Sequence, residues 1–179
     1  IHDLRMVQGP THTNLVFDAV VPYGFHRTHA QVKEEIEKIV QETWENYYAV
    51  IQVESGFRPQ VESKAGARGL MQMLPSTYKE QCALAGVPYD PENLFVPEIN
   101  IDTCTEYLCV LHELTGSWKW SHVAYFAGIG NVNRWREEGY TLENLPSERA
   151  RTYLERIESA YDAYGVLLQA TQSNTSGYL

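Results

Sequence analysis

The chain has 179 residues, of which 44% are hydrophobic. It contains 14 Lys and Arg residues and 23 Asp and Glu residues, which gives a formal net charge of -9. This length suits one compact domain with a small appendage and is enough to bury a sizeable core. The acidic balance without a basic stripe argues against a nucleic-acid partner, and no stretch reaches the roughly 18–20 apolar residues that a membrane span requires.

The first 45 residues are expected to contain a strand and a helix. The run "NLVFDAVVPYG" at residues 14–24 is rich in β-formers and follows the turn signal "GPTHT". Downstream, "THAQVKEEIEKIVQETW" alternates apolar and charged residues at helical spacing, with Thr28 as its candidate N-cap. The next segment, "YYAVIQVESGF" at residues 47–57, fits either a buried strand or a short buried helix, and periodicity does not choose between them.

The remainder of the chain is predicted to be helical. Expected helices lie in "PSTYKEQCALAG", in "NIDTCTEYLCVLHELTG", in "SHVAYFAGIGNVNRWREEG", which is interrupted at its glycines, and in "SERARTYLERIESAYDAYG". The polar tail "QATQSNTSGYL" is expected to be disordered. We therefore predict a mainly α protein with an N-terminal segment at 1–45, a helical domain at 46–166 and a tail at 167–179.

The three cysteines, Cys82, Cys104 and Cys109, form no CxxC pair. Buried free thiols are favoured, because free cysteine packs as a small hydrophobe, and a Cys82–Cys104 disulfide is the alternative left open.

Glu54 is the candidate catalytic residue. It follows an apolar run and precedes Ser55 and Gly56, in "VESGFRPQ". A carboxylic acid can donate a proton at neutral pH only if its pKa is raised, and both burial and a helix C-terminus favour the neutral form. The alternative is that Glu54 is a solvated charge at a helix end. The motifs elsewhere in the sequence decide between these two interpretations.

Those motifs occur in a characteristic order: "ESGFRP", "AGARGLMQMLPST", "NLFVPEINIDTCTEYL", "AYFAGIGNVNRW" and "LPSERARTYLERI". In this order and spacing, the chain from about Tyr47 to Tyr164 resembles the lytic transglycosylases of the lysozyme-like superfamily. The resemblance implies a lysozyme-like helical domain with a sugar-binding cleft. It also implies cleavage of the β-1,4 bond between N-acetylmuramic acid and N-acetylglucosamine in peptidoglycan, with formation of 1,6-anhydromuramoyl ends.

The resemblance makes Glu54 the single catalytic acid and base, with Glu62 taken as a surface loop residue. The expected substrate-binding residues are Ser55, Gln72, Met71, Tyr125 and Tyr153, and Gly69 and Leu70 would shape the turn that carries the amide. For Tyr153, ordinary core packing is an equally good interpretation. The chain departs from the family where Phe126 replaces an Asn and Ile129 replaces a Pro, and an acidic chain gains no electrostatic attraction to an anionic polymer.

Residues 1–53 resemble a different family, the cytosolic C-terminal domain of cation diffusion facilitator transporters. The two resemblances overlap on "YYAVIQV", which is a strand in one family and the catalytic helix in the other. The candidate metal ligands of that reading are His2, His12, His26 and His29, whose spacings match no compact zinc motif.

We therefore predict a lytic transglycosylase that needs no cofactor or metal, acts on glycan strands as a monomer and works in the cell envelope. The compartment is inferred from the substrate, since no signal peptide is visible and the sequence begins at Ile1. The alternatives are a glycan-binding module on the same fold, a lysozyme that uses water, and a metal-binding regulatory module from the N-terminal half.

Overall fold

The computed structural model describes residues 2–8, 13–18, 31 and 47–175, and the chain divides into two units, Ile1–Val40 and Gln41–Leu179. In the first unit, β1 (His2–Gln8) pairs antiparallel with β2 (Thr13–Asp18). The strand predicted from residue 14 is therefore present as far as Asp18. The helix predicted after residue 28, and the side chains of the four candidate metal-binding histidines, lie outside what the structure describes.

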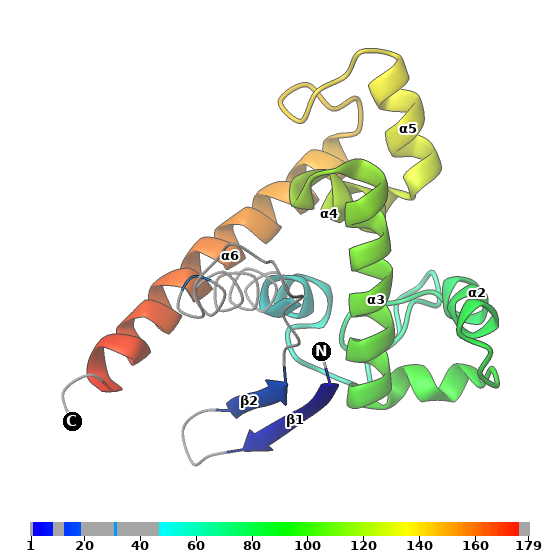
Figure 1. Cartoon of the computed structure of the whole chain (residues 1–179). Helices are drawn as coiled ribbons and strands as arrows, with labels where there is room; N and C mark the ends of the chain where they lie inside the picture. The colour runs from blue at the N-terminus through cyan, green and yellow to red at the C-terminus, as the bar shows by residue number, and fades with distance from the viewer. Residues whose placement is uncertain (1, 9–12, 19–30, 32–46, 176–179) are drawn as a thin grey trace, which may run out of the picture. The chain divides into compact units, whose positions relative to one another are not determined.

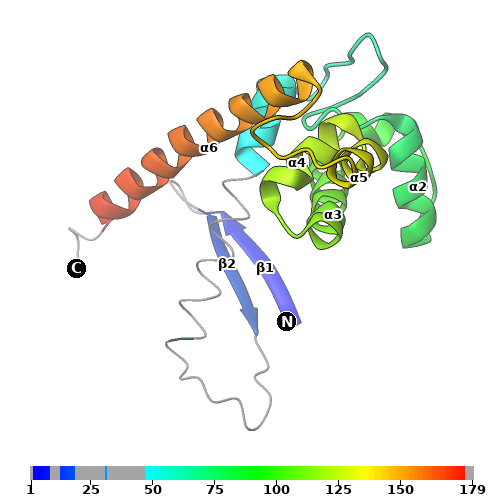
Figure 2. The same ribbon diagram turned by 90° about the horizontal axis from the view of Figure 1, so that it is seen from above.

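The second unit is helical (Figures 1 and 2). Residues 47–55 form a helix, hereafter the 47–55 helix. The elements that follow are α2 (Pro75–Ala85), the short 3-10 helix η1 (Pro91–Phe95), α3 (Pro97–Thr115), α4 (Trp118–Ala127), α5 (Ile129–Glu137) and α6 (Glu148–Thr175). A proline opens α2, η1 and α3, where its missing N–H costs nothing and its fixed φ suits the first helical turn.

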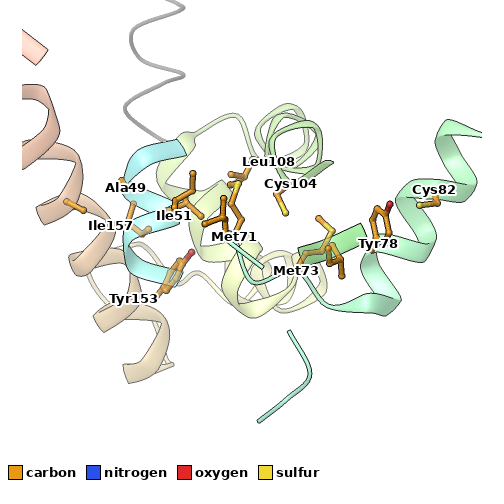
Figure 3. Close-up of a cluster of buried hydrophobic side chains, with 14 residues drawn as sticks. Ala49, Ile51, Met71, Met73, Tyr78, Cys82, Cys104, Leu108, Tyr153 and Ile157 are labelled. Atoms are coloured by element: carbon orange, nitrogen blue, oxygen red, sulfur yellow. The ribbon is translucent and has the colours of Figure 1, made fainter. Parts of the chain in front are cut away.

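Two hydrophobic clusters hold this unit together. The first joins the 47–55 helix to α2, α3 and α6 through side chains such as Val50, Met71, Leu108 and Ile157 (Figure 3). The second joins the end of α3 to α4, α5 and α6. Both clusters include residues of α3 and α6, so these two long helices tie the two halves of the core together.

The structure resolves the choice left open for residues 47–57. Ala49, Val50 and Ile51 are consecutive and all buried, as expected for a helix enclosed by neighbours on several sides. The interpretation of "YYAVIQV" as a strand, on which the transporter resemblance depended, is therefore wrong for these residues.

The last helix is longer than the sequence analysis expected. Backbone helix continues in α6 to Thr175, whereas the sequence analysis ended the domain at residue 166 and expected a disordered tail. A single Gly165 lowers helix propensity by only about 1 kcal/mol, and the Leu, Gln and Ala residues that follow it favour helix.

The favoured expectation for the cysteines holds. Cys82 and Cys104 are buried, Cys109 is partly buried and all three are free, so the favoured prediction of unpaired thiols is confirmed. Within the described residues, no helix combines the length and apolar character needed to cross a membrane, and no group of three or more His, Cys, Asp or Glu side chains is arranged to hold a metal ion.

Candidate active site

The 47–55 helix ends one residue after Glu54. Gly56 has φ +59° and donates its N–H to the Gln52 carbonyl over 3.1 Å, and Phe57 follows with φ +62°. Glycine adopts this left-handed conformation without steric cost, whereas a bulky Phe does so only under constraint. Two successive left-handed residues therefore stop the helix abruptly and hold Glu54 in its last turn.

Two arginines bind the carbonyl groups that this helix end leaves without intrahelical partners. The Arg58 side chain donates to the Ser55 carbonyl over 2.9 Å, and Arg156 of α6 donates to the Val53 carbonyl over 3.2 Å. Cations at a helix C-terminus are favourable, both for the exposed carbonyls and for the helix dipole. The end of the helix is thus held both by a near neighbour in the sequence and by a side chain of the distant helix α6.

The Glu54 carboxyl group has an unusual protonation equilibrium. Burial raises the pKa of Glu54 from 4.5 to about 7, while the Tyr153 hydroxyl and the Arg156 guanidinium act more weakly in the opposite direction. Tyr153 lies close enough to affect the carboxyl group, yet its buried hydroxyl forms no hydrogen bond of standard geometry. That hydroxyl is therefore ready to donate to Glu54 after a small movement.

Two further groups next to Glu54 are uncharged. Burial raises the pKa of the Cys104 thiol to about 12 and the pKa of the Tyr125 hydroxyl well above its ordinary value, and the Glu54 charge raises both further. Arg156 is therefore the charged partner of Glu54 among the groups that influence its pKa, and no carboxylate is among them. Glu62, the nearest carboxylate in sequence, is exposed and pairs with Arg68, as expected for a surface loop residue.

The second part of the site is the turn formed by residues 69–72, which Asn100 of α3 holds in place. The fully buried Asn100 side chain accepts from the Met71 N–H over 2.8 Å and donates to the Arg68 and Leu94 carbonyls over 3.1 and 2.9 Å. Gly69 has φ +79°, and a Cβ there would lie 2.0 Å from the Leu94 carbonyl oxygen. Only glycine fits this close approach.

Gln72 ends the turn with φ +52°. Its side-chain amide nitrogen donates to the carbonyls of Val61 and Gly69, each over 3.0 Å. Because both hydrogens of the amide nitrogen are donated to carbonyls of the turn, the side-chain amide oxygen of Gln72 is the atom that can accept a hydrogen bond from a ligand.

Tyr125 of α4 connects this turn to the helical half of the domain. Its hydroxyl donates to the Met71 carbonyl over 2.8 Å, and its ring packs against Tyr107 with centroids 5.9 Å apart. Tyr125 therefore positions the turn beside Glu54.

Two of the residues predicted to contact substrate are buried. Met71 is fully buried, and its side chain lies in the cluster between Ile51 and Leu108 (Figure 3). The Ser55 hydroxyl is also buried and donates to the Ile51 carbonyl over 3.1 Å. In this structure both residues pack or hydrogen-bond inside the protein next to the site.

Tyr153 and Phe126 form a stacked pair at the edge of the site. Their ring centroids lie 4.6 Å apart at an angle of 19°, and the Arg149 guanidinium carbon lies 5.8 Å from the Phe126 centroid. Tyr153 is buried whereas Phe126 is 37% exposed, so the stack leads from the neighbourhood of Glu54 to solvent.

The sequence analysis did not select Asn100, Arg149 or Arg156. The two arginines could have been found from their helical spacing around Tyr153, whereas no local pattern marks Asn100 as buried. A cavity of about 380 Å³ lies between α2, η1 and α3, and none of the residues that line it belongs to the Glu54 site.

Comparison with known proteins agrees with this geometry. The family model "Transglycosylase SLT domain" matches residues 31–146. The chain belongs to the transglycosylase SLT domain family. The soluble lytic murein transglycosylase of Escherichia coli K12 is 34% identical to it over an alignment of 126 residues, and the match covers 65% of this chain and 19% of that relative. This SLT domain thus spans about a fifth of the length of that curated relative.

Solved structures of SLT proteins share the fold. The 70-kDa soluble lytic transglycosylase of Escherichia coli matches with a TM-score of 0.62 and 32% identity, covering 67% of this chain and 21% of that one. An inactive Glu-to-Gln mutant of a lytic transglycosylase from Pseudomonas aeruginosa matches with a TM-score of 0.65 and 29% identity, covering 82% of this chain and 25% of the other. The predicted mainly α, lysozyme-like fold is confirmed.

Proposed function

We propose that this SLT domain is a peptidoglycan lytic transglycosylase that cleaves the bond between N-acetylmuramic acid and N-acetylglucosamine and leaves 1,6-anhydromuramoyl ends. The observation that carries the proposal is Glu54, a largely buried carboxyl group at a helix end with a pKa raised to about 7. Such a group is half protonated near neutral pH and can serve first as acid and then as base.

In the first step, Glu54 protonates the glycosidic oxygen as the bond to the muramoyl C1 breaks. Positive charge then develops on the sugar ring, and the Glu54 carboxylate that has just formed faces it. In the second step, the muramoyl 6-hydroxyl attacks C1 and gives its proton to Glu54, which restores the acid. Arg156 and the Tyr153 hydroxyl would stabilise the carboxylate between the two steps.

Among the described residues, no carboxylate is one of the groups that shift the pKa of Glu54, and this favours the proposed reaction over hydrolysis. Glycosidases that use water ordinarily employ two carboxyl groups, one as the acid and the other as base or nucleophile. The groups that influence the Glu54 pKa are a phenol and a guanidinium. With an internal 6-hydroxyl as nucleophile, one carboxyl group suffices. The Glu-to-Gln change in the inactive Pseudomonas aeruginosa relative also supports a glutamate in this role.

The test is digestion of purified peptidoglycan with the wild type, Glu54→Gln and Glu62→Gln, followed by mass spectrometry of the soluble products. We expect anhydromuramoyl products from the wild type and from Glu62→Gln, and none from Glu54→Gln. Glu62→Gln is the matched control because it removes the nearest carboxylate in sequence.

Other outcomes identify other functions. Products with reducing ends, each heavier by one water, would indicate a lysozyme. If no variant released product but all bound the glycan, the domain would be a binding module, an alternative raised by Phe126 at the edge of the site. Because peptidoglycan lies in the cell envelope, we place the proposed activity there.

A further inference from the structure

One face of α6 carries two arginines on either side of Tyr153. Arg149, Tyr153 and Arg156 are spaced four and three residues apart, so they lie along the same side of the helix. Tyr153 lies near Glu54, and Arg156 binds the carbonyl group of Val53 on the 47–55 helix. This face of α6 is therefore the one turned toward the acid.

Arg149 is held at the outer end of this face. Its guanidinium lies over the ring of Phe126, which in turn stacks on Tyr153. A guanidinium over an aromatic face is stabilised by about 0.5–1 kcal/mol at an exposed site and loses part of its freedom before any ligand arrives. Arg149 is thus partly preorganised at the solvent side of the stack that leads to Glu54.

Arg149 also lacks an internal partner for its charge. The ion pairs of the described residues involve Arg68 and Lys119, and within that part of the chain no carboxylate pairs with Arg149. In a chain with a net charge of -9, Arg149 is therefore a cation without an ion-pair partner among the described residues, and its guanidinium lies over Phe126 at the solvent side of the stack. Planar guanidinium groups bind carboxylates through two parallel hydrogen bonds.

We propose that Arg149, supported by Phe126, is a subsite that recognises a carboxylate of the glycan strand. The inference rests on the proposed function for its substrate class. The carboxylate belongs either to the lactyl group of a muramoyl residue without a peptide or to a peptide stem attached to it. A local cation of this kind lets an acidic domain select an anionic polymer without a basic surface.

The test measures binding in the Glu54→Gln background, so that the ligand stays intact. Dissociation constants are determined by calorimetry for three ligands: glycan oligomers with peptide stems, the same oligomers after amidase has removed the stems, and a chitin tetrasaccharide without any carboxylate. Arg149→Gln is compared with Arg134→Gln, an exposed arginine of α5 that bonds to Asn131 on its own helix.

We expect Arg149→Gln to weaken binding of a carboxylate-bearing ligand by about three- to tenfold and to leave the chitin tetrasaccharide unaffected. Weakening confined to stem-bearing oligomers would identify the stem, and weakening of the amidase-treated oligomers would identify the lactyl group. Arg134→Gln should change none of the three constants.

The proposal is overturned if Arg149→Gln changes no dissociation constant, or if it weakens all three equally, which would indicate a packing role. Unchanged melting temperature of Arg149→Gln verifies that the fold is intact. Because binding is measured in an inactive background, the result does not depend on the products of the wild type. Failure of the cleavage assay and failure of this subsite can therefore be told apart.

Discussion

The hydroxyl of Tyr125 donates a 2.8 Å hydrogen bond to the main-chain carbonyl of Met71, 54 residues earlier in the chain. The bond links α4 to the turn at residues 69–72, and it is partly buried. The position of Gln72 relative to Glu54 therefore depends on a phenol that need not contact substrate.

Tyr125→Phe tests this dependence. The ring still fills its site, but the Met71 carbonyl loses its partner, so the free energy of unfolding should fall by about 1–2 kcal/mol. Peptidoglycan cleavage should fall as well, because the turn is less well positioned. Denaturant unfolding and product release measure the two effects. Tyr140→Phe, at an exposed tyrosine, is the control and should change neither.

Gly69→Ala should be far more destabilising than Gly66→Ala. Both glycines have φ near +80°, so each alanine suffers a similar backbone strain of about 1 kcal/mol. Only at Gly69 does the new methyl group meet the Leu94 carbonyl and the Asn100 amide, whereas the space around Gly66 is open. We expect Gly69→Ala to lose at least about 2 kcal/mol more than Gly66→Ala in denaturant unfolding. Equal losses would show that the turn can move away from Asn100.

The pH dependence of stability should reveal Glu54 and His122 as opposing groups. The folded-state pKa of Glu54 is raised from 4.5 to about 7, so its contribution to stability is lost as pH rises through this window. Burial lowers the pKa of His122 from 6.5 to about 4, so stability is lost as pH falls from 6.5 to 4. Each group changes the free energy of unfolding by at most about 1.4 kcal/mol per pH unit. Between pH 4.5 and 6.5 the two contributions have opposite signs.

The free energy of unfolding of the wild type should therefore be nearly constant over that range, while Glu54→Gln should become more stable as pH rises. His122→Gln should show the reverse slope, because the Glu54 contribution then stands alone. Denaturant unfolding at several pH values measures the slopes, and comparing slopes removes the fixed cost of each substitution. A flat profile for Glu54→Gln would mean that the pKa of His122 is not lowered, and a flat profile for His122→Gln would mean that the pKa of Glu54 is not raised.

Arg156→Gln should move the alkaline limb of the pH–rate profile to higher pH. The guanidinium favours the ionised form of Glu54, so its removal raises the pKa of the acid further and keeps it protonated to higher pH. A displacement of roughly half to one pH unit is expected, with Arg156→Lys closer to the wild type because it keeps the charge. A lower rate without displacement of the limb would indicate that Arg156 acts only through its bond to the Val53 carbonyl.

Most helix positions could be predicted because they rest on local signals, whereas Glu54 was selected through the order of the family motifs around it. Proline at a first turn and the apolar run before Glu54 are readable without tertiary contacts. The direction of the Met71 side chain could not be predicted, since an irregular turn has no periodicity that separates inward from outward residues. Asn100 presents the same difficulty, because its burial follows from backbone groups of a distant loop that need its amide.

The choice between strand and helix at residues 47–57 shows another limit. An element enclosed on several sides loses the alternation that distinguishes the two periodicities, and the neighbours that enclose it are contributed by α3 and α6. Likewise, the pKa of Glu54 depends on burial that no local sequence pattern encodes.

The bond from Arg156 to the Val53 carbonyl spans 103 residues, and this separation has a consequence for folding. During synthesis at about 5–20 residues per second, Glu54 is added to the chain roughly 5 to 20 s before Arg156. Until α6 docks, the 47–55 helix lacks the partners that bury its acid, so the carboxyl group should titrate like an ordinary glutamate. The chain therefore acquires its proposed proton donor only when nearly the whole second unit has been assembled.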